Sequence, residues 1–161
     1  MPITFHTADV KFSLKEKKKL KEFIRHQTLD IGHQTVNLSF VFCSDVYLLA
    51  INKKFLGHDY YTDIITFPLS ENEQVLAGEI YISIDRVKDN AKKYSAHFFS
   101  PFKGEGARRA DEDAELHRVM FHGVLHMLGY KDKTKPQKAE MRKMEDKWLG
   151  KFKDQGSKTN K

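Results

Sequence analysis

Cysteine is nearly absent from this sequence, and long apolar runs are missing from it altogether. Cys43 is the single cysteine among 161 residues, which excludes an internal disulfide and a cysteine-based zinc site. No run of about 18 apolar residues is present, and residues 1–6 have neither the basic start nor the apolar stretch of a signal peptide. We therefore expect a cytoplasmic protein with no membrane anchor and no disulfide-linked partner, in which Cys43 is a buried, inert thiol.

Acidic residues are too few to balance the basic ones, and the imbalance is confined to one end of the chain. The net charge is +6, and residues 131–161 carry all of it, with 11 Lys or Arg against 5 Asp or Glu. Residues 1–130 are neutral. This excess favours a partner with a phosphate backbone, although the same lysines could be the solvated face of a terminal helix.

The composition predicts one domain, residues 1–149, because 40% of the chain is hydrophobic and can supply one core. Residues 150–161 show no apolar pattern and are predicted to form a disordered basic tail. Short strands interleaved with helices favour an α+β fold, in which helices cover a small mixed β-sheet. The expected strands are residues 3–7, 36–42, 63–68 and 79–84, and the expected helices begin near Ser13, Asp45, Asp85, Asp111 and Pro136.

Two histidines stand four residues apart in one of the predicted helices. His122 and His126 would lie on the same helix face, so both imidazoles could bind one metal ion. Gly129 is placed to end the helix with a left-handed turn, and Asp132 follows with a carboxylate that could complete the site. Three protein ligands leave a fourth position for water, which is typical of catalytic zinc. The spacing alone also permits two half-buried histidines without a metal.

Gly123 occupies the position where zinc peptidases of the His-Glu-x-x-His type carry their general base. Glycine has no side chain that could take a proton, so peptide hydrolysis is disfavoured. A glycine on this side of the helix would instead leave room for something bulky near the metal, or would let another element pack closely.

Residues 122–130, His-Gly-Val-Leu-His-Met-Leu-Gly-Tyr, resemble the signature of the YbeY-type endoribonucleases, which are bacterial ribosomal RNA maturation factors. Residues 62–68, Thr-Asp-Ile-Ile-Thr-Phe-Pro, followed by residues 78–80, Gly-Glu-Ile, are similar to a second block of that family. The resemblance implies an α+β fold with about four strands and one zinc ion at the end of a helix. It also implies an activity that cleaves single-stranded RNA during ribosomal RNA maturation and ribosome quality control, with the small ribosomal subunit as partner.

The chain departs from the family pattern at several positions. Asp132 stands where the third ligand is usually His, and a carboxylate also suits Mg²⁺ or Mn²⁺. Lys131 stands where Asp is usual. Leu56 stands where the family carries an Arg that faces the active site, so a phosphate contact there would pass to a neighbour such as His58 or Lys54.

Our hypothesis from the sequence is a zinc-dependent endoribonuclease. His122, His126 and Asp132 would hold the ion and act catalytically through a water bound to it. Four further residues are candidates near the RNA: Lys131, Lys133 and Lys54 as contacts to the backbone, and His58 as a catalytic or positioning group. The alternatives are a non-catalytic, metal-stabilised ribosome-assembly factor that binds RNA and, with less support, a metallopeptidase.

Overall fold

The computed structural model describes residues 3–70, 72–97 and 105–158 of the chain. The core elements are four strands and five α-helices, with one π-helical turn, η1, that continues the second helix. In chain order they are β1 (Ile3–Thr7), α1 (Lys17–Asp30), β2 (Thr35–Cys43), α2 (Asp45–Ile51), η1 (Asn52–Leu56), β3 (Ile64–Pro68), β4 (Val75–Ser83), α3 (Ile84–His97), α4 (Glu105–Met127) and α5 (Lys135–Lys158).

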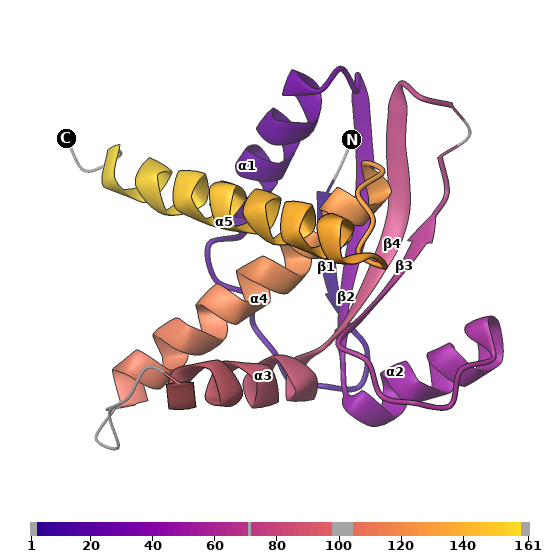
Figure 1. The fold of residues 1–161 in the computed structure, drawn as a ribbon, viewed down its shortest axis with the longest axis vertical. Helices are drawn as coiled ribbons and strands as arrows, with labels where there is room; N and C mark the ends of the chain where they lie inside the picture. The colour runs from indigo at the N-terminus through magenta and orange to yellow at the C-terminus, as the bar shows by residue number, and fades with distance from the viewer. Residues whose placement is uncertain (1–2, 71, 98–104, 159–161) are drawn as a thin grey trace.

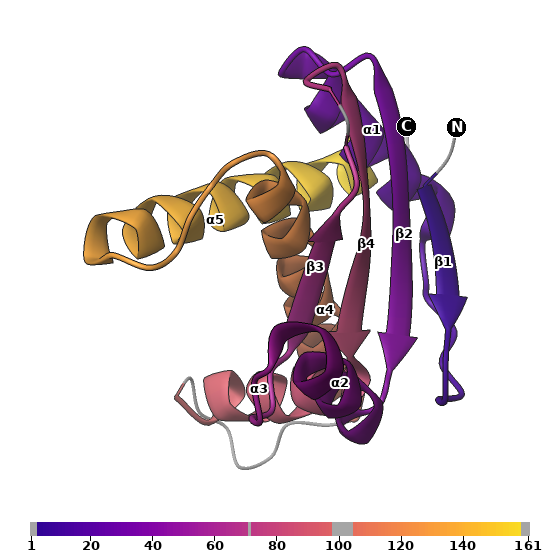
Figure 2. The same cartoon turned by 90° about the vertical axis from the view of Figure 1, so that its right-hand side faces the viewer.

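The four strands form one mixed sheet in the order β1-β2-β4-β3, which can be followed across Figure 2. β2 runs parallel to both β1 and β4, and it pairs with β4 along its whole length from Thr35 to Cys43. β3 is antiparallel to β4 and forms one edge of the sheet. The predicted α+β fold with a small mixed sheet of about four strands is therefore confirmed.

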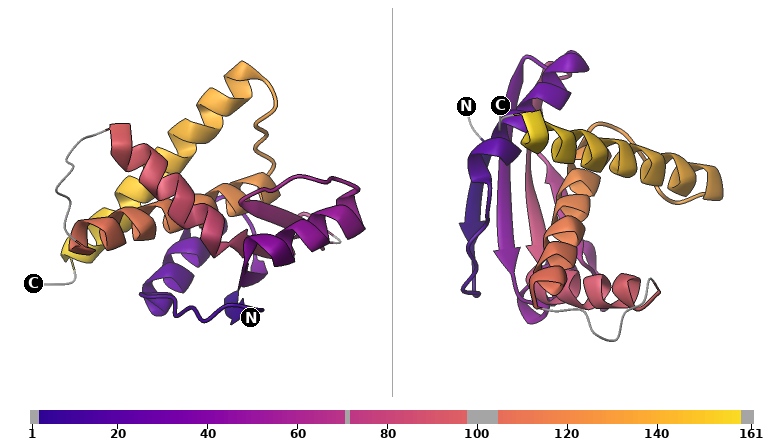
Figure 3. Two further views of the ribbon diagram at one scale, coloured as in Figure 1. Left: turned by 90° about the horizontal axis from the view of Figure 1, so that it is seen from below. Right: turned by 90° about the vertical axis from the view of Figure 1, so that its left-hand side faces the viewer.

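The two faces of the sheet are covered unequally. Alternate residues of β2 and β4 point into a large core built with α1, α4 and α5, and Leu38, Phe40 and Ile80 are fully buried there. Figure 3 shows α4 and α5 on this side of the sheet. The opposite face carries a small cluster in which Leu48 of α2 packs on Cys43, with Ile65 of β3 beside them. Cys43 is buried, as predicted, and burial raises its thiol pKa to about 12.

Aromatic rings join the three helices of the large core. Phe23 of α1 and Phe121 of α4 lie with their centroids 5.2 Å apart, and Trp148 of α5 contacts both rings edge-on. Phe152 packs against the same pair. Large aromatic side chains contribute much of the apolar area that a core of this size buries. This cluster packs α5 against α4, and Figure 1 shows the two helices crossing. The packing determines which side chains of α5 reach the end of α4.

The predicted disordered tail is wrong over most of its length. Residues 150–158 continue α5, and Phe152 is buried in the core. Phe152 follows Trp148 by four residues and therefore continues the apolar stripe of the helix, even though charged residues surround it in the sequence. Residues 159–161 lie outside the described residues.

Two predicted helix starts also differ from the structure. The expected capping box at residues 13–16 does not form, because Glu16 has a left-handed backbone (φ 58°) and its side chain makes no capping hydrogen bond. Ser44 rather than Asp45 caps α2, since its hydroxyl accepts a hydrogen bond from the backbone N–H of Tyr47.

Other boundaries move by a few residues. α4 begins at Glu105 rather than near Asp111, so it has a longer exposed N-terminal part than its apolar stripe indicates. β4 begins at Val75 rather than Glu79 because its first residues pair with the start of β2. No helix in the described ranges is both long enough and apolar enough to cross a membrane. The expected loop near residues 100–106 lies largely outside the described residues.

Candidate metal centre

The candidate metal centre lies at the C-terminal end of α4, where the chain reverses. Gly129 has φ 103°, a left-handed conformation that glycine adopts without a Cβ clash. The N–H of Tyr130 donates to the carbonyl of Leu125 at 3.0 Å, which is the long bond of a Schellman cap. The cap turns residues 130–132 back along the helix, as the sequence predicts, and so brings Asp132 towards the last turn of α4.

Three ligand atoms converge beside this turn. The Nε2 atoms of His122 and His126 each lie 3.3 Å from the same oxygen, Oδ2 of Asp132. The two imidazole planes are nearly perpendicular, with their centroids 4.5 Å apart. Within the described part of the chain, these three side chains form the one group of His, Cys, Asp or Glu residues arranged to hold a metal ion. The structure thus brings together the three residues that the sequence singles out.

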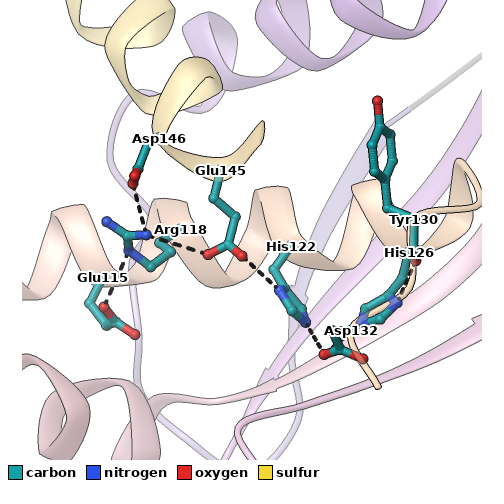
Figure 4. A network of polar contacts seen from close by, with 8 residues as sticks. All are labelled: Glu115, Arg118, His122, His126, Tyr130, Asp132, Glu145 and Asp146. Carbon is teal, nitrogen blue, oxygen red and sulfur yellow. Dashed lines mark hydrogen bonds and ion pairs between the residues drawn. The ribbon is translucent and has the colours of Figure 1, made fainter. Parts of the chain in front are cut away.

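Each imidazole is oriented through its other nitrogen. Nδ1 of His122 donates to a carboxylate oxygen of Glu145 at 3.1 Å, and Nδ1 of His126 donates to the backbone carbonyl of Tyr130 at 3.0 Å. Figure 4 shows both contacts on the far side of the rings from Asp132. Partners of this kind fix the tautomer and the orientation of metal-binding histidines.

The hydrogen-bonding pattern fits a cation between the rings. Because the partners of Nδ1 can only accept, each Nδ1 carries the hydrogen, and the Nε2 of a neutral ring is then an acceptor. Two such nitrogens facing the Asp132 carboxylate place three acceptors together, which a bound cation would satisfy. Burial lowers the pKa of His122, but its hydrogen bond to Glu145 and the charges of Glu145 and Asp132 outweigh burial and raise that pKa. A proton on the ring would then compete with a metal ion.

An ion-pair network that is only partly buried supports the Glu145 carboxylate. Arg118 of α4 lies 3.5 Å from Oε1 of Glu145 and 3.1 Å from a carboxylate oxygen of Asp146. Arg118 also faces Glu115 at 3.9 Å, and burial raises the pKa of the Glu115 carboxyl to about 7. Figure 4 shows this network running along α4 from Glu115 to His122. It connects the metal-binding histidine to the packing between α4 and α5.

A cleft of about 540 Å³ opens in front of the three ligands. Its walls come from three segments: the end of η1, the loop before β3 and β3 itself. Asp63 lies in this wall, and burial raises its carboxyl pKa, with the charge of His122 opposing the change. Besides the three ligands, the lining residues are Asn52, Leu56, His58, Tyr60, Thr62, Asp63, Ile64, Ile65 and Thr66.

Gly123 lies on the side of α4 that faces the sheet. A Cβ at this position would come within 2.7 Å of Cδ1 of Ile64 and 3.1 Å of Cγ2 of Ile80. Of the two uses that the sequence leaves open for this glycine, the structure therefore shows the close approach of another element. Gly123 lets α4 sit directly on β3 and β4, which places the cleft wall next to the ligands.

The four candidate RNA-contacting residues fall in different places. His58 lines the cleft, whereas Lys54 lies on η1 with its ammonium over the ring of Phe55. Lys131 lines a second hollow beside Gly129, and Lys133 is exposed near the start of α5. Both lysines flank Asp132 in the sequence, and neither of them lines the cleft.

Sequence reasoning missed Glu145, which holds the first histidine. A signal for it exists, because Met141, Glu145 and Trp148 follow one another at spacings of four and three on the buried face of α5. A carboxylate in an apolar helix stripe requires a partner. The identity of that partner depends on how α5 crosses α4, which the helical pattern does not define.

Known proteins resemble this chain over nearly its whole length. A family model described as endoribonuclease YbeY matches residues 2–153. A protein named endoribonuclease YbeY from Cytophaga hutchinsonii is 41% identical over 144 residues, which cover 89% of this chain and 91% of that protein. One of the same name from Amoebophilus asiaticus is 41% identical over 147 residues, 91% of this chain and 90% of that protein.

The fold also has a counterpart among solved structures. The solution structure of a protein from Thermotoga maritima matches with a TM-score of 0.59, covering 98% of this chain and 93% of the other. Its sequence identity of 22% limits this similarity to the fold. The family model and the relatives establish more: this chain belongs to the YbeY family of endoribonucleases.

Proposed function

We propose that this protein is a zinc-dependent endoribonuclease that hydrolyses phosphodiesters of single-stranded RNA during ribosomal RNA maturation and ribosome quality control. It would act in the cytoplasm on the RNA of the small ribosomal subunit. The observation that carries the proposal is the convergence of His122, His126 and Asp132 at one end of an open cleft, in a chain of an endoribonuclease family.

The donor set and its spacing support zinc. Imidazole nitrogen suits Zn²⁺ better than Mg²⁺, which prefers oxygen ligands in an octahedron. In a tetrahedron with Zn–ligand distances of about 2.0–2.1 Å, neighbouring ligand atoms lie about 3.3–3.4 Å apart, against about 2.9 Å in an octahedron of that size. Both Nε2 to Oδ2 distances here, from His122 and from His126 to Asp132, are 3.3 Å. These spacings favour a tetrahedral ion over magnesium.

The residues around the ligands prepare the site for phosphodiester hydrolysis. A divalent ion held there would acidify a water from a pKa of about 15.7 towards 7 and offset charge on the phosphoryl oxygens. Glu145 and the carbonyl of Tyr130 hold the two Nδ1 protons, which keeps both Nε2 lone pairs directed at the ion. Ile64 and Ile65 supply apolar lining on the β3 side of the cleft.

The remaining candidates would guide the RNA. His58, in the cleft wall, would contact the backbone next to the scissile phosphate, where Leu56 cannot because it has no polar group. Lys54, Lys131 and Lys133 lie outside the cleft walls and would contact phosphates of the strand as it leaves the cleft.

The test is cleavage of a single-stranded RNA by the purified, zinc-loaded protein. We expect cleavage that a chelator abolishes and zinc restores, and that is lost in the variant His126→Ala. His26→Ala, which changes an exposed histidine of α1 paired with Asp30, is the matched control and should cleave normally. Circular dichroism verifies that both variants are folded.

Two results would reject the enzyme. Normal cleavage by folded His126→Ala protein would show that the metal centre is not the active site. Chelator-sensitive cleavage of casein with RNA left intact would instead restore the peptidase alternative, which Gly123 disfavours.

A further inference from the structure

Exposed aromatic side chains gather next to the metal cleft. Phe55 of η1 is 61% exposed, and Tyr60 and Tyr61, in the segment between η1 and β3, are 56% and 52% exposed. Leaving large aromatic groups in water forgoes the free energy that their burial would supply. Several together on a surface next to a cleft are typical of a binding surface.

Tyr60 is held firmly although its side chain is open to solvent. Its ring lies nearly parallel to that of His58, at an interplanar angle of 20° with centroids 5.1 Å apart. The Tyr60 hydroxyl shares a hydrogen bond with Nδ1 of His58 at 2.9 Å. The buried Asn52 side chain donates to the backbone carbonyl of Tyr60 at 2.8 Å. The two rings are therefore stacked on each other as a pair of defined orientation.

This stacked pair of rings lies in the same cleft as the three candidate metal ligands. His58 and Tyr60 both line the cleft that His122, His126 and Asp132 also line. A ligand long enough to reach from the ligand triad along the wall would therefore contact the two rings.

Cationic groups accompany the neighbouring aromatic rings. The ammonium of Lys54 lies 5.3 Å from the centroid of Phe55, and the guanidinium of Arg86 lies 5.2 Å from that of Tyr61. Arg86 is also paired with Asp45 at 2.8 Å, so Lys54 is the cation better placed for an anionic ligand. Flat rings beside a cation match a single nucleic-acid strand, in which stacked bases alternate with phosphates. A protein partner that bound only through apolar side chains would make no use of the Lys54 ammonium.

We propose that the paired rings of Tyr60 and His58 form a stacking platform for a nucleobase of the RNA strand whose phosphodiester lies at the metal centre. This inference rests on the proposed function, because it assigns a subsite to the same substrate. The ring of Tyr60 provides the stacking surface, and His58 fixes its orientation. A duplex hides its bases inside the helix, so the platform would favour single-stranded over double-stranded RNA.

The experiment measures binding without cleavage. A fluorescein-labelled single-stranded 12-nucleotide RNA is titrated with full-length protein in a chelator, and affinity is read from fluorescence anisotropy. Base stacking on an aromatic ring is worth about 1–3 kcal/mol, so Tyr60→Leu should weaken binding about 5- to 150-fold. Tyr60→Phe keeps the ring and should stay within about twofold. Tyr47→Leu, a tyrosine outside the cleft lining, is the matched control and should bind like the unmodified protein.

An abasic scan identifies stacking itself. At one position of the RNA, replacing the nucleotide by an abasic ribonucleotide should weaken binding to the unmodified protein. The same replacement should cause no further loss of affinity in the Tyr60→Leu variant. Equal affinities of Tyr60→Leu and the unmodified protein, or fully additive losses at every abasic position, would overturn the platform. If the zinc-loaded, unmodified protein also fails to cleave single-stranded RNA, the proposed function fails as well, which separates that failure from failure of the platform alone.

Discussion

Glu115 offers a test of the ion-pair network behind the metal centre. Its side chain, on α4, is 8% exposed. Burial raises its carboxyl pKa from 4.5 to about 7, and the charge of Arg118 offsets burial only in part. The folded protein therefore binds the carboxyl proton of Glu115 more tightly than the unfolded chain does.

The size and sign of the effect follow from linkage. Each pH unit between the folded and unfolded pKa values corresponds to 1.36 kcal/mol, so the difference between 4.5 and about 7 amounts to about 3 kcal/mol. Because the folded-state pKa of Glu115 is the higher one, its contribution to stability is fully present below pH 4.5. The contribution is lost as the pH rises through about 7.

The assay compares Glu115→Gln with the unmodified protein by urea unfolding at pH 5, 6, 7 and 8, in a chelator. The amide of glutamine does not titrate, so the variant should gain about 2.5 kcal/mol relative to the unmodified protein between pH 5 and pH 8, because part of the effect is already lost at pH 5. Glu140→Gln, an exposed site on α5, should show no such change. A pH-independent difference between Glu115→Gln and the unmodified protein would refute the reasoning.

Three further predictions concern the ligands, the sheet and the charge. Glu145→Ala should weaken zinc binding about 10- to 100-fold in a chelator competition, because one imidazole loses its orienting acceptor; unchanged affinity would contradict that role. Gly78→Ala places a Cβ 2.7 Å from a backbone carbonyl oxygen of β3, so the free energy of unfolding in urea should fall by about 1–3 kcal/mol. An unaltered free energy of unfolding would show that the strands move apart without cost, which contradicts this prediction. Replacing Lys131 and Lys133 together by Ala should lower the slope of log affinity for single-stranded RNA against log salt by about 1.4, and an identical slope would place both lysines outside the RNA interface.

Local signals in the sequence were sufficient for the turn of the metal centre. The spacing of His122 and His126 on one helix, together with the glycine that ends it, predicts both the shared face and the reversal of the chain. The Schellman cap and the convergence on Asp132 follow from these contacts within eleven residues. Such short-range geometry depends little on the rest of the fold.

Contacts between distant elements were not predictable in the same way. Glu145 reaches His122 only because aromatic packing sets how α5 crosses α4, and nothing local in either helix defines that crossing. Phe152 shows the same effect, since a single apolar residue among lysines becomes core only once α1 is beside it. Tyr60 and His58 meet because the buried Asn52 anchors the loop between them and β3.

X-ray diffraction at the zinc absorption edge, from crystals of protein purified without a metal-affinity tag, tests the central claim most directly. The account predicts one anomalous peak per chain, about 2.0–2.2 Å from Nε2 of His122, Nε2 of His126 and a carboxylate oxygen of Asp132. A map with no peak between the two imidazoles, and with the Asp132 carboxylate turned away from them, would contradict it.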